Sequence, residues 1–364
     1  MAFLRGRAGP ASVLLGLASL LISAGPAAAP CTDDGAGSQL ARAAAGLAAG
    51  QWCDFDAAET PGLAAELAVA PGDENNYVNW QHGAQWDPVH HLWLFHGYDY
   101  APISAAMVVY DEAGNRWYVE RDRPFAPGGN GHDYDQTVVD PETGAAYYRP
   151  RLSNTVWRAS WDPLAKAHAW EARAVAPLGR GCPSQAAREA NGMAWDGQRH
   201  GIVLLSAAEG GVVCFWDRAR NRWRIDAHIE LSSAYHQVVE WDPVAGIAWL
   251  SDYLSLRHWQ DDRGKVTQLA STPPFTLGCC GSSGADITAD PASGLFVVTR
   301  EVDGQRLWYE FDLRADRWRA IDHSMPPLGS NVGSLGGPVD AYGVIMYLSA
   351  GPGGPQLYLY RHAR

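Results

Sequence analysis

Short apolar and aromatic runs alternate with turn residues along most of the chain, and a clear example lies between residues 83 and 120. Four runs, at residues 83–86, 92–97, 106–111 and 116–120, are separated by Asp-Pro, Gly and Asn turn chemistry. No run is long enough, or has its apolar residues spaced at three and four positions, to predict a helix. Such runs predict strands joined by tight turns, so we expect a four-stranded antiparallel sheet here.

The same pattern repeats along the chain, and two landmarks mark the copies. The first is an Asp in the turn between the first two strands, at Asp87, Asp140, Asp196, Asp242, Asp290 and Asp340, which lie 53, 56, 46, 48 and 50 residues apart. The second is an Asp followed by a Trp between the third and fourth strands, at Asp111 and Trp117, Asp162 and Trp170, Asp217 and Trp223, and Asp312 and Trp318. The fourth copy departs from this landmark at residues 260–264. A four-stranded repeat of about 50 residues is typical of kelch-type β-propeller blades.

From about residue 46 to its C-terminus the chain therefore resembles the kelch-like β-propeller superfamily, although the paired glycines usual after the second strand are mostly missing. The resemblance implies an all-β fold, a single six-bladed propeller, with five or seven blades as the alternatives. The blades are expected at about 83–120, 132–177, 191–227, 235–270, 284–321 and 335–362. The last copy offers only three strands, so we expect a strand at about 50–56 to complete it and close the ring, which removes exposed sheet edges.

The N-terminal residues have the pattern of a secretory signal peptide. Arg5 and Arg7 precede an apolar stretch at residues 13–22, and the segment closes on three alanines ending at Ala29. This predicts cleavage after Ala29, with residues 30–364 forming the propeller domain. The apolar stretch is too short to span a bilayer. We expect an exported protein, periplasmic or extracellular, that does not insert into a membrane.

The cysteine content agrees with export. Six cysteines in an exported chain favour disulfides over metal thiolates. The pairs Cys31–Cys53 and Cys182–Cys214 are the expected bridges. Cys279 and Cys280 are adjacent, and a strained vicinal disulfide and two separate bridges both remain open for them.

The formal net charge of −12 argues against nucleic acid or an anionic membrane as the partner. Sixteen tryptophans suggest sugar stacking at first, but most stand at repeat positions, where blades pack face to face and need large flat side chains. Trp80 and Trp259 fall outside that pattern and are candidate surface contacts. A single repeat period throughout predicts one domain, and we expect a monomer.

In this architecture one face of the ring collects the loops before each first strand and after each second strand. Ionisable and aromatic residues are concentrated at those positions. They include His82, His96, Tyr134 and Arg149. Tyr100, His132, Arg151, His236, Tyr253 and Arg300 stand at such positions too.

Over about seventy residues this arrangement is similar to that of propeller polysaccharide lyases, notably the ulvan lyases. The resemblance implies β-elimination on an acidic, uronate-containing polysaccharide, which needs a cation or donor at the sugar carboxylate together with a base and an acid. By the same resemblance His82 and His96 would be acid/base or carboxylate-contacting residues, and Tyr134 would transfer the proton, with His132 as its competitor. Arg149 or Arg151 would neutralise the carboxylate. The residues expected to bind substrate are Tyr100, His132, Arg151, His236, Tyr253 and Arg300.

Other hypotheses stand beside the lyase. A non-catalytic carbohydrate- or protein-binding propeller explains the fold and the aromatic rim equally well. Three histidines on neighbouring blades suit zinc or copper, and copper-radical oxidases are also built on kelch propellers, but their Tyr–Cys motif has no clear counterpart here. Zinc or calcium inside a lyase site is a further expectation. The alternatives with a purely structural role are local hydrogen bonds for the histidines and a buried ion pair of Arg149 with Asp133 or Asp135.

Overall fold

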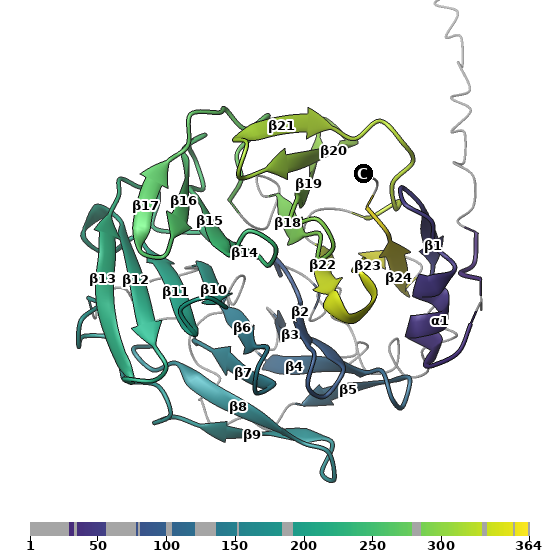
Figure 1. Cartoon of the computed structure of the whole chain (residues 1–364), viewed down its shortest axis with the longest axis horizontal. Helices are drawn as coiled ribbons and strands as arrows, with labels where there is room; N and C mark the ends of the chain where they lie inside the picture. The colour runs from purple at the N-terminus through teal and green to yellow at the C-terminus, as the bar shows by residue number, and fades with distance from the viewer. Residues whose placement is uncertain are drawn as a thin grey trace, which may run out of the picture.

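The structure is a computed structural model, and it describes residues 29–32, 35–55, 78, 81–99, 104–120, 136–150, 153–183, 192–278, 285–329, 333–351 and 354–362. Six four-stranded antiparallel sheets stand around a common axis, as Figure 1 shows. This confirms the predicted all-β, six-bladed propeller. The ring is built from strands because the apolar runs are short and each ends at a turn residue.

Each sheet is one blade, and the four strands of a blade follow one another in sequence except in blade 6. The strands of blades 1 to 3 are β2 (Gln85–Asp87), β3 (Leu92–Asp99), β4 (Ser104–Asp111), β5 (Arg116–Glu120), β6 (Thr137–Asp140), β7 (Ala145–Tyr148), β8 (Trp157–Asp162), β9 (Ala167–Glu171), β10 (Gly192–Asp196), β11 (Gly201–Ser206), β12 (Val212–Asp217) and β13 (Arg222–His228). Those of blades 4 to 6 are β14 (Val238–Asp242), β15 (Ile247–Ser251), β16 (His258–Asp262), β17 (Lys265–Gln268), β18 (Asp286–Ala289), β19 (Phe296–Val302), β20 (Gln305–Asp312), β21 (Arg317–Ala320), β22 (Ser334–Val339), β23 (Val344–Gly351), β24 (Gly354–Tyr360) and β1 (Trp52–Asp54).

The first strands of neighbouring blades contact one another all the way around the axis. They are therefore the innermost strands and form the wall of the central channel. The hydrophobic core is divided into six clusters, and each one fills the space between two neighbouring blades. The short helix α1 (Gln39–Ala45) adds Leu40, Ala43 and Ala44 to the cluster between blades 6 and 1.

The ring is closed by the N-terminal strand, as predicted. β1 pairs antiparallel with β24, placing Cys53 opposite Leu359 and making β1 the outermost strand of blade 6. Blades 6 and 1 also meet at the axis, where Ala84 N donates to Gly336 O at 2.9 Å. A Cβ on Gly337 would stand only 2.6 Å from Ala84 O, so this close approach requires glycine.

The repeated aspartates are turn residues. In blades 1, 3, 4 and 5 the buried carboxylate at the end of the first strand accepts backbone N–H groups two and three positions ahead; Asp87, for example, accepts from Val89 at 2.8 Å and His90 at 3.2 Å. In blade 2, Asp140 accepts from the Glu142 N–H and from the Thr143 hydroxyl. Asp340 instead begins the short 3₁₀ helix η3 (Asp340–Tyr342). In blade 4, Arg263 and Gly264 both have positive φ, which is typical of the two-residue turn that joins β16 and β17.

Most repeat tryptophans are core residues, as expected: Trp86, Trp117, Trp161, Trp195, Trp216 and Trp223 are all buried. Trp259 is also buried, at 4% exposure, so its interpretation as a surface contact was wrong. It pairs with Leu250 of the neighbouring strand and belongs to the cluster between blades 3 and 4. Trp80 lies outside the described residues.

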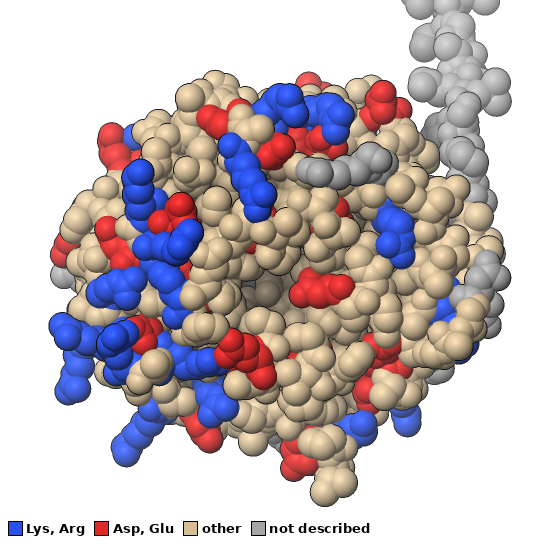
Figure 2. Space-filling view, in the orientation of Figure 1, with Lys and Arg blue, Asp and Glu red and all other residues tan. Residues whose placement is uncertain are grey.

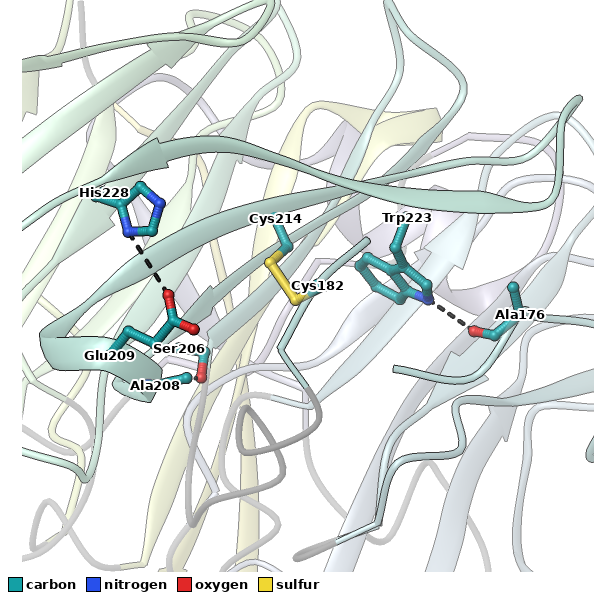
Figure 3. The surroundings of a disulfide bond; sticks show 8 residues. All are labelled: Ala176, Cys182, Ser206, Ala208, Glu209, Cys214, Trp223 and His228. Carbon is teal, nitrogen blue, oxygen red and sulfur yellow. Dashed lines mark hydrogen bonds and ion pairs between the residues drawn. A yellow bond between two sulfur atoms is a disulfide. The ribbon is translucent and has the colours of Figure 1, made fainter. Parts of the chain in front are cut away.

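Both expected disulfides are present, Cys31–Cys53 and Cys182–Cys214. In Figure 3 the second bridge fastens the segment before blade 3 to β12, and Trp223 Nε1 donates to Ala176 O of the same segment at 2.7 Å. The first bridge fastens the N-terminal segment to β1. Cys279 and Cys280 lie outside the described residues.

Candidate functional site

In blades 1 to 5, strand pairing places one residue of each second strand at the same distance along the chain from the turn aspartate that precedes it. These equivalent residues are His96, Arg149, Leu205, Ser251 and Thr299. All are buried, and the four polar ones, every member except Leu205, are called the polar layer below. Buried polar side chains in otherwise apolar strands indicate that a candidate functional site lies at this level of the propeller.

His96 lies at the junction of blades 1 and 2. Its imidazole stacks on the phenol ring of Tyr148, with centroids 3.7 Å apart and planes inclined by 22°. Both side chains are about 1% exposed. The pair forms because His96 of β3 faces blade 2, and Tyr148, the last residue of β7, faces blade 1.

Arg149 follows Tyr148 directly and is completely buried. Its guanidinium donates to Ser153 O at 3.3 Å and to Gln136 Oε1, and its backbone N–H donates to Gln136 O at 3.2 Å. Ser153 O and Gln136 Oε1 are neutral oxygens, so these contacts orient the guanidinium without neutralising its charge. Asp133 and Asp135, the alternative ion-pair partners, lie outside the described residues.

His82 immediately precedes the first blade and points into the channel. It is completely buried, and its Nε2 lies 3.1 Å from Glu240 Oε1 of β14, which belongs to blade 4 on the opposite side of the ring. Glu240 keeps 14% of its side chain exposed. Burial raises the pKa of Glu240 to about 8, so this carboxyl holds a proton at neutral pH. A His and a protonated Glu in contact form a competent acid/base pair.

A second carboxyl group lies near His82. Asp286, the first residue of β18, accepts from Ser334 Oγ at 2.9 Å and lies 3.8 Å from Arg306. Burial raises the pKa of Asp286 to about 6, and the positive charges of Arg306 and His82 oppose that increase. Burial and the neighbouring Tyr360 and Asp286 hold the pKa of Tyr347 well above its usual value. Glu240 and Asp286 therefore titrate closer to neutral pH than ordinary carboxyl groups do, whereas Tyr347 keeps its proton.

Three of the expected substrate-binding residues meet at the junction of blades 4 and 5. The rings of His236 and Tyr253 have centroids 4.6 Å apart. Arg300 donates to Thr276 Oγ1 at 2.5 Å and lies over the ring of Phe275. Burial lowers the pKa of Arg300, and the nearby Tyr253 opposes this.

The predicted site residues thus fall into three places: the junction of blades 1 and 2, the channel, and the junction of blades 4 and 5. Tyr100, His132, Tyr134 and Arg151 lie outside the described residues. The sequence analysis missed Tyr148 and Glu240. Counting from the turn aspartates reaches the polar layer and so points to Tyr148, which is the residue before Arg149. Nothing local in the sequence points to Glu240, because its contact with His82 joins residues 158 positions apart.

In the described part of the chain, no group of three or more His, Cys, Asp or Glu residues is arranged to hold a metal ion. The expected zinc, calcium or copper therefore has no ligand set among these residues. The described residues also include no helix that is long and apolar enough to cross a membrane.

Neither protein-family models nor curated proteins match this chain. Solved structures do resemble it. A structural genomics protein of unknown function from Bacteroides thetaiotaomicron is 11% identical, with a TM-score of 0.53, over 84% of this chain and 75% of its own. A mutant of AofleA from Arthrobotrys oligospora is 10% identical, with a TM-score of 0.52, over 92% and 91%. A fungal alcohol oxidase in complex with copper is 10% identical, with a TM-score of 0.46, over 77% and 74%. At these identities the likeness shows the fold alone, and the protein is a six-bladed β-propeller.

Proposed function

We propose that the protein is an exported polysaccharide lyase that cleaves a uronate-containing glycan by β-elimination. The observation that supports this most is the junction of blades 1 and 2, where His96 stacks on Tyr148 and the buried Arg149 follows directly. The reaction requires a cation at the sugar carboxylate, a base and an acid, and Arg, His and Tyr supply these three functions.

In the proposed reaction, Arg149 pairs with the uronate carboxylate and so makes the neighbouring C–H more acidic. His96 or Tyr134 removes that proton. The C–H electron pair forms the new carbon–carbon double bond, the glycosidic carbon–oxygen bond breaks, and its electron pair stays on the departing oxygen. That oxygen takes a proton from the acid partner, for which His82 and its contact with Glu240 are the source.

Export belongs to the same proposal. Disulfides persist in oxidising compartments, and two of them fasten segments of this propeller. The signal-peptide pattern of residues 1–29 supplies the route. A polymeric substrate that cannot enter a cell fits an enzyme that works outside it.

A second candidate function is that of a non-catalytic binding propeller. The observation that favours it lies around the His236–Tyr253 pair, where three large side chains are exposed: Tyr235 at 44%, Leu254 at 58% and Leu256 at 43%. Exposed aromatic and apolar side chains that gather in one place are typical of binding surfaces.

The test is to mix the folded protein with a panel of acidic polysaccharides and follow the ultraviolet absorbance of the conjugated, unsaturated uronate product. Under the lyase proposal the absorbance rises steadily with one member of the panel. A flat trace with every uronate polymer, from protein shown to be folded, overturns the proposal. Binding of a glycan that is weakened by Tyr235→Ala, without turnover, would then establish the second candidate.

A further inference from the structure

The channel ends at the turn aspartates in a cavity of about 130 Å³, which is separate from the junction of blades 1 and 2. On the same measure one ordered water needs roughly 10–15 Å³, so the cavity has room for a small molecule. Innermost strands or first turns of all six blades contribute to its wall. In Figure 2 the ring is hollowed at its centre, with carboxylate side chains at the rim.

The wall combines indole rings with carboxyl groups. Trp86, Trp195 and Trp241 come from blades 1, 3 and 4, and the carboxyl groups are those of Glu240 and Asp340. Among the described residues that line the cavity there is no lysine, arginine or histidine. In Figure 2 the Lys and Arg side chains of this face are most numerous at the left, with others at the top and right, and they lie away from the central hollow.

We propose that this axial cavity binds a small organic ammonium ion. Indole faces attract ammonium groups through their quadrupole, and quaternary ammonium ions are the ligands for which aromatic enclosures are best known. Asp340 at the rim supplies a negative charge, and Glu240 supplies a second one when it releases its proton. An anionic ligand is disfavoured by the same two carboxyl groups.

The charge on Glu240 links binding to pH. Its pKa is about 8 because of burial, and a bound cation stabilises the ionised form, so binding expels the proton. The other titratable groups that face Glu240 are His82, at 3.1 Å, and Asp340 at the cavity rim, with Asp286 next to His82. Protonation of any of these groups adds positive charge and also weakens cation binding. Affinity for the cation therefore rises with pH up to about 8.

The experiment is a calorimetric titration of the folded, disulfide-bonded protein with choline and, separately, with its uncharged isostere 3,3-dimethylbutan-1-ol. Choline is expected to bind roughly tenfold more tightly than the isostere. Its dissociation constant should increase about tenfold for each pH unit below about 8, through the linked proton. Equal affinity for the two probes, or no binding of either, overturns the proposal.

Variants that leave His82 and Glu240 intact distinguish ligand binding in this cavity from the proposed catalysis. Asp340→Asn and Trp241→Ala should each weaken choline binding roughly tenfold while any lyase turnover is unchanged. Glu171→Gln, which removes a carboxylate that is 60% exposed on blade 2, is the control for net charge and should have no effect on binding. If Glu171→Gln weakens choline binding as much as Asp340→Asn does, the attraction is non-specific and the proposal fails.

Discussion

The imidazole of His96 lies almost flat on the phenol ring of Tyr148, with 3.7 Å between the ring centroids, although the two residues belong to different blades. The packing of blade 1 against blade 2 therefore sets the position of His96 relative to the backbone that carries Arg149. A substitution in the apolar cluster between these blades, such as one at Leu94 or Val139, would disturb all three side chains together.

Arg149 is expected to be the residue that turnover depends on most. Arg149→Gln should lower kcat by roughly 10²–10³-fold, because the developing negative charge on the uronate loses its cation. Arg149→Lys keeps the charge but loses the planar fork, and should retain more activity than the Gln variant. Product absorbance measures both variants, with circular dichroism as the check on folding. A folded Arg149→Gln variant with full kcat would contradict the role.

Tyr134 is expected to transfer a proton. Tyr134→Phe removes the hydroxyl and keeps the ring, so kcat should fall by roughly 10²–10⁴-fold while KM changes little. Tyr235→Phe is the matched control, since Tyr235 is exposed on blade 4 and has no part in the proposed chemistry. If Tyr134→Phe changes KM alone, Tyr134 binds substrate and the proton transfer belongs to His96.

Arg199 is expected to be a stability residue that joins blades 3 and 4. Its guanidinium contacts the buried carboxylates of Asp196, Asp226 and Asp261. Arg199→Met leaves Asp196 and Asp261 without their cation, while Asp226 keeps Arg224, and should lower the free energy of unfolding by about 3–5 kcal/mol. Denaturant unfolding measures this loss.

The control for Arg199 is Arg220→Met, which removes the exposed partner of Asp217. The Arg220 side chain is 78% exposed, and exposed pairs contribute only about 0–1 kcal/mol. Equal losses of stability in the two variants would show that the buried carboxylates are not the cause.

Stability is expected to fall as pH rises through the range set by Glu240. Its pKa is raised from 4.5 to about 8 in the folded protein, so between these values the native state holds a proton that the unfolded state has lost. The stability associated with that proton is fully present below about 4.5 and is lost as pH rises through about 8. The slope from one group is at most about 1.4 kcal/mol per pH unit.

Glu240→Gln removes this titration and should flatten the dependence of Tm on pH over that range. Asp286 has a pKa raised to about 6, so it contributes a smaller decline in stability that ends at a lower pH. This decline should remain in the Glu240→Gln variant. Thermal unfolding across the pH range gives both slopes. An unchanged profile in the variant would mean that Glu240 is ionised in the folded protein at neutral pH.

The parts of the fold that local chemistry determines were predictable from the sequence. Asp87 and its counterparts mark the blades because each carboxylate bonds N–H groups only two or three residues away. Closure of the ring by an N-terminal strand was predictable because the last copy of the repeat lacked one strand. Trp259 was misjudged because its burial depends on packing between blades 3 and 4, which no nearby residue reveals.

The site was less predictable for the same physical reason. His82 and His96 were found by residue type and by position in the repeat. Their partners Glu240 and Tyr148 come from other blades, and only the closed ring brings them together. The raised pKa of Glu240 likewise comes from burial in the channel, which depends on all six innermost strands.

The pairing of β1 with β24 has a consequence for the order of events during synthesis. Trp52 lies opposite Tyr360, so β1 emerges from the ribosome long before its partner strand exists. Contacts between residues so far apart in sequence form slowly. Until β24 has been synthesised, the unpaired edge of β1 promotes aggregation. A chaperone that protects the early segment until the last blade has been made should therefore raise the yield of the folded protein more than a slower rate of translation does.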